Sequence, residues 1–165
     1  MPFDYFKRLS RTHQQIYLKS DRISTIKLPQ PESFHPLVEE IENALASEDR
    51  RLTQKATQQL ITSIIGSLKI RSLKVKVLEK RPSHNWGELQ GLYEPDTQEQ
   101  SDQITVWMRT AQRKQVVAFK TFLRTVLHEL CHHLDYELLG LKETFHTQGF
   151  FKRESSLFHQ LVKKR

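Results

Sequence analysis

One stretch of the chain, TVLHELCHHLDYELLG at residues 125–140, combines several metal-binding residue types in a regular spacing. Within it, His128, Glu129 and His132 form an H-E-x-x-H pattern. On a helix, residues four apart lie on the same face with Cβ atoms about 5–6 Å apart, so two imidazoles there can bind one metal ion. The pattern therefore predicts a Zn²⁺ site on a helix, with the glutamate beside it.

Glu129 has the position of a general base. Zn²⁺ lowers the pKa of a bound water to about 7 and polarises a carbonyl group. A carboxylate next to the first ligand can take the proton of that water, which gives peptide hydrolysis without a protein nucleophile. The alternative is an amphipathic helix that is merely rich in histidine. The metal site is favoured because the motif lies inside a predicted helix that follows a predicted strand.

A third ligand must come from elsewhere, because catalytic zinc sites usually have three protein ligands and an open position. His146 is the first candidate, since it follows a glycine-containing reversal of the chain and can fold back over the helix. Glu154 is the second candidate and Glu143 the third, because glutamates also serve as zinc ligands. The alternative for His146 is a solvent-facing or helix-capping histidine.

Three neighbours of the motif are expected to have lesser roles. Asp135 lies three residues after His132, on nearly the same face, so it could accept the free N–H of a ligand histidine and fix its tautomer. A surface carboxylate is the alternative. Cys131 is expected to be a small buried hydrophobe, and His133 to lie at the surface or behind a ligand.

The elements that must position these residues are helices and short strands. Helical spacing predicts a helical region over residues 36–67, with a bend near 48–50, a long helix over 112–139 that ends before Gly140, and a last helix within 147–165. Alternating or β-branched residues predict strands near 72–79, 88–94 and 103–108. This order predicts an α+β domain with N-terminal helices, a small three-stranded sheet, the H-E-x-x-H helix and a C-terminal helix.

The length of 165 residues suits one domain. Prolines at positions 29, 31 and 36 punctuate the chain after an N-terminal part whose pattern is mixed. We therefore expect residues 1–30 to form an arm and residues 31–165 to form the metal-binding domain.

The composition bounds the environment of the protein. A single cysteine excludes an intrachain disulfide framework and a cysteine-rich zinc ribbon. No apolar run approaches the roughly 20 residues that cross a bilayer, and the N-terminus lacks a secretion signal. These features predict a cytoplasmic protein without a membrane partner.

The net charge of +7 favours polyanions as partners. The basic stretch that includes Lys69, Arg71, Lys74 and Lys76 is the best candidate for nucleic-acid contact, with a solvated face of the sheet as the alternative. Trp86 could stack on a base, although a packed loop anchor is the simpler expectation.

The segments LHELCHHLDY and HTQGFFKRESSL resemble the SprT-like zinc metallopeptidases, which include the Spartan-type proteases. That family pairs an H-E-x-x-H helix with a third histidine in a His-x-x-x-Phe segment, which corresponds here to His146 and Phe150. The resemblance implies a compact zincin-like fold, a Zn²⁺ cofactor, and a sheet whose edge strand pairs with the substrate. Spartan-type members degrade proteins crosslinked to DNA. Many members also carry a zinc ribbon, for which this sequence lacks the cysteines.

The main hypothesis is therefore a zinc-dependent endopeptidase that acts on a protein or peptide substrate, with DNA-associated proteins as the implied class. We expect the strand at residues 103–108 to align the extended substrate by main-chain pairing. Two alternatives stay open. One is a non-catalytic, zinc-stabilised module that binds nucleic acid or protein, and the other is a regulatory protease with one dedicated protein substrate.

Overall fold

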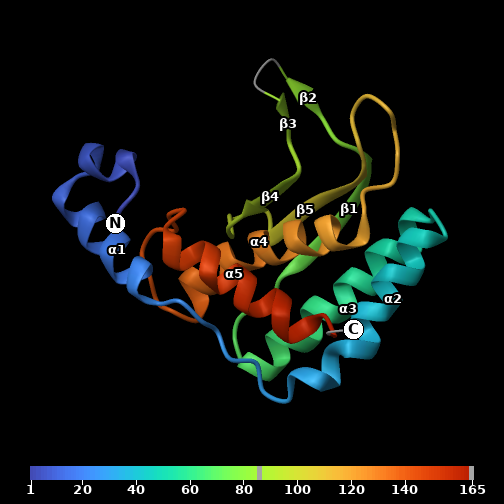
Figure 1. Ribbon diagram of the computed structural model, residues 1–165, viewed down its shortest axis with the longest axis horizontal. Coiled ribbons are helices and arrows are strands. Elements are labelled where there is room, and N and C mark those ends of the chain that lie inside the picture. The colour runs from blue at the N-terminus through green and yellow to red at the C-terminus, as the bar shows by residue number, and fades with distance from the viewer. Residues whose placement is uncertain (85–86, 164–165) are drawn as a thin grey trace.

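The computed structural model describes residues 1–84 and 87–163, so Trp86 and the last two residues lie outside the described part of the chain (Figure 1). Over these residues the chain forms five α-helices, a mixed three-stranded sheet and a two-stranded hairpin, in agreement with the predicted α+β class. In chain order the elements are η1 (Asp4–Arg8), α1 (Arg11–Arg22), η2 (Pro31–Phe34), α2 (His35–Ala46), α3 (Arg50–Leu68), β1 (Lys74–Lys80), β2 (Ser83–His84), β3 (Gly87–Glu88), β4 (Gly91–Glu94), β5 (Gln103–Arg109), α4 (Phe119–Glu137) and α5 (Gln148–Leu161).

The predicted bend near residues 48–50 separates α2 from α3. Glu48 has a positive φ of 60°, which a continuous helix does not tolerate, and the carboxylate of Asp49 then caps α3 by accepting a hydrogen bond from the N–H of Leu52. The helical region predicted over 36–67 is thus confirmed as two helices.

The helix that carries the H-E-x-x-H motif begins later than its spacing predicts. Residues 112–118 do not join α4, because the chain first turns back on β5. The N–H of Thr110 bonds the carbonyl of Gln115, and the N–H of Val117 bonds that of Met108. At the other end, Gly140 has a φ of 64°, the left-handed conformation that terminates helices.

The sheet has the strand order β1-β5-β4, with β1 parallel and β4 antiparallel to β5. The prediction that residues 103–108 pair with substrate is therefore wrong. β5 is the central strand, and its main-chain groups are already bonded to a neighbour on each side. Among the described strands of this sheet, β4 is the edge that lies beside α4.

The outer edge of β1 is covered by side chains from α3. Gln58 accepts a hydrogen bond from the N–H of Val75 at 2.7 Å and donates one to the carbonyl of Leu73 at 3.1 Å. One turn earlier, Gln54 accepts from the N–H of Val77 at 2.9 Å. These amides replace a missing neighbour strand, which protects an otherwise open edge.

One continuous core joins the helices to the sheet. Its members include Val75 and Val77 of β1, as the alternation predicts, and the apolar face of α4, with Leu123, Val126, Leu127 and Leu130 all 0% exposed. α4 packs against both the sheet and α5, so the motif helix is held between two layers (Figure 1). None of the described helices is long and apolar enough to cross a membrane.

The N-terminal part forms a lobe beside α5 (Figure 1). Its helix α1 packs against α5, and Tyr17 is 0% exposed. Ile26 and Leu28, which follow α1, belong to the main core. The division at residue 30 stays a prediction, but the residues before it are packed onto the rest of the chain.

Candidate metal centre

Three histidine side chains from two parts of the chain meet at one point. His128 and His132 lie one turn apart on α4, and His146 lies just before Thr147, which caps the N-terminus of α5. The Nε2 atom of His146 is 3.2 Å from that of His128 and 3.1 Å from that of His132. Among the described residues, these three could hold a metal ion. The structure thus brings together the first-choice ligand set, and neither Glu143 nor Glu154 belongs to it.

Hydrogen bonds fix the tautomers of the two helix histidines. The Nδ1 of His128 is 2.8 Å from a carboxylate oxygen of Glu154, which can only accept, so this nitrogen carries the proton. The Nδ1 of His132 is 2.8 Å from the hydroxyl of Thr144, which already donates its own proton to Asp135. In both rings the Nε2 atom is therefore a free acceptor that faces the common point.

This donor set fits a tetrahedral cation. Two nitrogens that each lie about 2.0–2.1 Å from such an ion are about 3.3 Å apart, close to the distances observed. Burial, and then the neighbouring His128 and His146, lower the pKa of His132 to about 3, so this ring stays neutral and able to bind a metal.

Glu154 and Asp135 support the ligands. Glu154 was the second candidate for the third ligand, but it accepts the N–H of His128 and thus orients that ring. Asp135 acts on His132 through Thr144, whose hydroxyl stands between them. The other carboxylate oxygen of Asp135 is 3.0 Å from the guanidinium of Arg153, and both side chains are 0% exposed.

Glu129 lies on the same helix beside the ligands and is almost buried. Burial, assisted by the charge of Glu154 and opposed by His128, raises its pKa to about 7. A carboxyl group with this pKa can both take and return a proton near neutral pH. Together with His128 it lines a pocket of about 400 Å³ whose other walls are Gln90, Gly91, Thr121, Arg124, Thr125 and Glu154.

No family model, curated protein or solved structure matches this chain. The candidate site therefore rests on its own geometry.

Tyr93 closes the side of the site that faces the sheet. Its ring stacks on His132 with centroids 6.2 Å apart, and its hydroxyl is 3.1 Å from the Nδ1 of His133. His133 is 0% exposed and also bonds the carbonyl of Arg71 at 2.8 Å, so of its two expected positions the one at the surface is wrong. His133 thus fixes the hydroxyl of Tyr93, while the ring of Tyr93 stacks on His132.

The remaining predicted residues lie away from the three histidines. Cys131 is fully buried in the core, as expected for a small hydrophobe. Lys69, Lys74 and Lys76 are exposed, whereas the guanidinium of Arg71 forms ion pairs with Asp96 and Asp102. Of the four basic residues predicted to contact nucleic acid, the three lysines are exposed, and Arg71 is already paired with carboxylates.

No pattern in the sequence points to Thr144 or Tyr93. Neither has a fixed spacing from the motif, because each reaches the site through the fold. The one available hint for Thr144 is its place two residues before His146 in the returning chain.

Proposed function

We propose that this chain is a zinc-dependent endopeptidase. The observation that carries the proposal is the convergence of the Nε2 atoms of three histidines beside the buried carboxyl of Glu129, at the wall of a pocket. Three histidines that leave one position open are a typical donor set of catalytic zinc sites. A site with only a structural role would instead be closed by a fourth protein ligand.

Each residue of the site has a distinct role in this proposal. When bound, zinc would supply the Lewis acidity that activates a water and polarises the substrate carbonyl. Glu129 takes the proton from the water and later delivers it to the leaving amine, a task that suits its pKa of about 7. Glu154 and Thr144 hold the rings of His128 and His132 in the tautomer that leaves Nε2 free.

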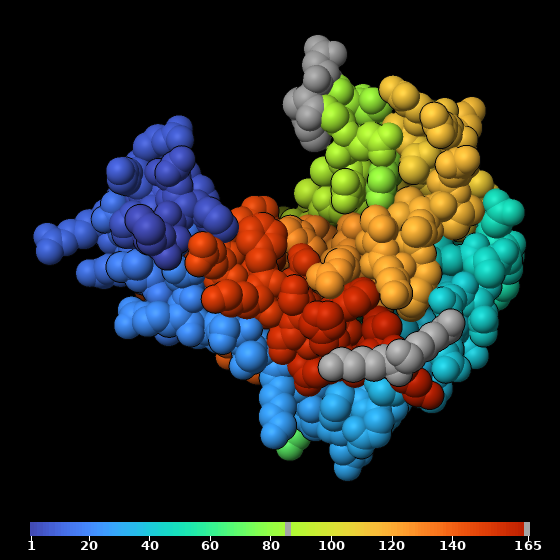
Figure 2. Space-filling view, viewed as in Figure 1, coloured from blue at the N-terminus to red at the C-terminus, as the bar shows by residue number. Residues whose placement is uncertain are grey.

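The edge strand β4 is the element best placed to bind an extended peptide. It lies beside α4, and Gly91 at its start lines the same pocket as Glu129. A substrate that pairs with the free edge of β4 would run past the metal ligands. Figure 2 shows the molecule hollowed between the N-terminal lobe and the β2–β3 hairpin, which leaves this side open.

The resemblance to SprT-like metallopeptidases supports the same activity and a zincin-like fold. It also suggests DNA-associated proteins as substrates, which the net charge of +7 and the exposed Lys69, Lys74 and Lys76 suit. We propose this substrate class as the first to test, ahead of a single dedicated protein partner.

The decisive experiment compares Glu129→Gln with Glu143→Gln. Elemental analysis of the purified wild type should find one zinc per chain. Glu129→Gln should keep that zinc and lose about 100- to 10,000-fold of the peptidase activity, because only proton transfer is removed. Glu143→Gln is the control, since this residue is outside the metal group, and it should keep both.

Three results would contradict the proposal. A wild-type protein that takes up no zinc leaves the site without its cofactor. A Glu129→Gln variant with undiminished cleavage removes the general base from the mechanism. Tight zinc binding with strongly salt-dependent DNA binding, but without cleavage of any protein, would point instead to the non-catalytic module.

A further inference from the structure

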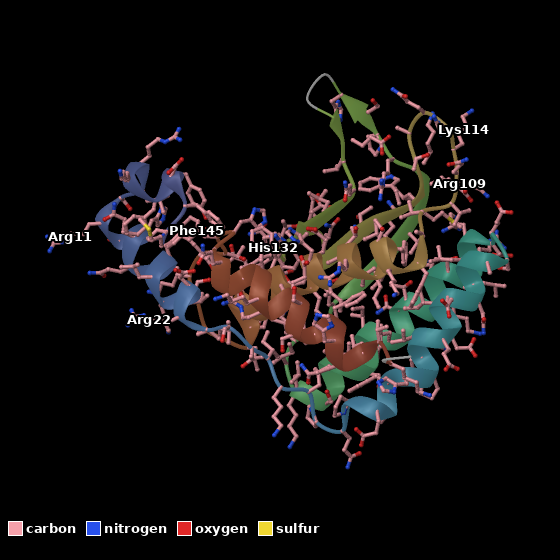
Figure 3. The ribbon with its side chains drawn as sticks, in the orientation of Figure 1. Arg11, Arg22, Arg109, Lys114, His132 and Phe145 are labelled. Atoms are coloured by element: carbon pink, nitrogen blue, oxygen red, sulfur yellow. The ribbon has the colours of Figure 1, made fainter. Side chains whose placement is uncertain are left out.

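The segment that carries the third histidine is held by side chains from the other end of the chain. The hydroxyl of Tyr5 donates a hydrogen bond to the main-chain carbonyl of His146 at 2.7 Å. The preceding Phe145 packs its ring between His13 and Tyr17, with centroid distances of 5.5 Å and 6.3 Å. In Figure 3, Phe145 lies next to the N-terminal lobe, while His132 lies toward the middle of the molecule.

The residues after His146 are fixed against the end of α1. The hydroxyls of Ser20 and Thr147, both 0% exposed, are 3.1 Å apart, and the N–H of Gly149 donates to the carboxylate of Asp21 at 3.1 Å. A Cβ atom on Gly149 would lie 2.5 Å from the carbonyl oxygen of Ser20 and 2.6 Å from that of Asp21. Only glycine allows the two helices to come this close.

A buried arginine extends this contact to a second ligand. The guanidinium of Arg153 donates to the carbonyl oxygens of Ser20 and Ile23, and to the hydroxyl of Ser20 at 2.9 Å. The same group donates to Asp135 at 3.0 Å, and Asp135 accepts the proton of Thr144, the partner of His132. An unbroken chain of hydrogen bonds therefore runs from Ser20 to the ligand His132.

We propose that residues 3–28, here called the N-terminal segment, position the metal ligands, with Tyr5 and Ser20 as the positioning residues. Tyr5 sets the main chain of His146, and Ser20 sets Arg153 and, through it, the support of His132. The inference rests on the metal centre of the proposed function, but it does not require that the protein hydrolyses peptides. The N-terminal segment thus contributes to the geometry of the metal site, and is more than an arm attached to the domain.

The test measures metal binding by full-length Tyr5→Phe and Ser20→Ala variants. Tyr5→Phe keeps the aromatic ring and removes only the hydroxyl, so it disturbs the fold little. Both variants should bind Zn²⁺ about 10-fold more weakly than the wild type, the usual effect of losing an outer partner of a metal ligand. Both should also change the visible absorption of the Co²⁺-loaded protein, because that spectrum reports the ligand geometry.

Gln160→Leu is the matched control. Gln160 anchors the same N-terminal segment by bonding the carbonyl of Ile26 at 2.7 Å and the N–H of Leu28 at 2.9 Å, but it has no contact with the ligand network. This variant should lower the melting temperature and leave the Zn²⁺ affinity and the Co²⁺ spectrum unchanged. A purely structural role for the segment would give all three variants the same behaviour.

The outcomes separate this inference from the proposed function. If Tyr5→Phe and Ser20→Ala match the wild type in affinity and spectrum, the positioning role is wrong and the peptidase proposal is untouched. If both variants weaken binding as expected but the wild type cleaves no protein, the positioning role stands without the peptidase. If the wild type binds neither Zn²⁺ nor Co²⁺, both proposals fail.

Discussion

At Gly91 the edge of the sheet comes close to the candidate general base. A Cβ atom there would lie 2.8 Å from the Cγ2 atom of Thr125 and 3.2 Å from a carboxylate oxygen of Glu129. Gly91→Ala should therefore displace this carboxylate and lower kcat by about 100-fold, while the zinc content stays the same. Gly66→Ala is the control, because a Cβ atom at Gly66 meets nothing within 4 Å. Equal kcat for both variants would show that Glu129 accommodates the methyl group.

The protonation of His132 links the stability of the metal-free fold to pH. Its pKa is lowered to about 3 in the folded chain, against about 6.5 when unfolded. Between these values the unfolded state binds more protons, so stability is full above pH 6.5 and is lost as the pH falls toward 3. The slope from this residue is at most about 1.4 kcal/mol per pH unit.

Denaturant unfolding in the presence of a chelator, at pH 7, 6 and 5, measures this linkage. His132→Asn removes the titrating group, so its stability should depend less steeply on pH than that of the wild type. The lowered pKa of His146 acts in the same direction and remains in both proteins. Parallel pH profiles would assign the acid sensitivity to other groups.

The spacing of His128 and His132 in the sequence is enough to predict a pair of metal ligands, because a helix fixes which residues share a face. The choice of His146 over Glu154 was open for a physical reason. Both residues lie in the part of the chain that folds back onto α4. Only the packing of α5 places the imidazole of His146 beside the other two histidines and the carboxylate of Glu154 behind His128.

The side-chain amide of Gln58 on α3 bonds main-chain groups at the outer edge of β1, where a neighbouring strand would otherwise do so. Gln58→Leu would leave the N–H of Val75 and the carbonyl of Leu73 without their partner. We expect a loss of about 1–3 kcal/mol in the free energy of unfolding, the usual effect of an unsatisfied buried polar group. Gln59→Leu, at an exposed position on the same helix, should change it by less than about 0.5 kcal/mol. Similar losses in the two variants would mean that the amide of Gln58 contributes little.

The existence of the elements could be predicted from local patterns, but their pairing could not. The alternation of Val75 and Val77 with lysines marked β1, and the β-branched run marked β5. Nothing local indicates that β1 and β5 pair in parallel, with β4 added at the far side. This order leaves β4 as the edge strand beside α4, which is the strand that a peptide would reach under the proposed function.

Metal binding should stabilise the molecule as a whole, because the ligands join α4 to the segment before α5. At a Zn²⁺ concentration about 1,000 times Kd, the gain is about 4 kcal/mol, which corresponds to a rise in Tm of roughly 10 °C. His146→Ala should lose most of this rise, whereas His159→Ala, at an exposed position on α5, should keep it. Thermal unfolding with and without a chelator measures both. A rise in Tm that survives His146→Ala would place the bound metal elsewhere.

The contact between Ser20 and Arg153 also sets a time at which the site can be complete. These residues are 133 positions apart in the chain. A ribosome adds about 5–20 residues per second, so roughly 7–27 s pass between their synthesis. The support of His132 that runs from Ser20 through Arg153 can form only after Arg153 has emerged. During translation, the H-E-x-x-H helix is therefore made before the residue that completes the support of His132.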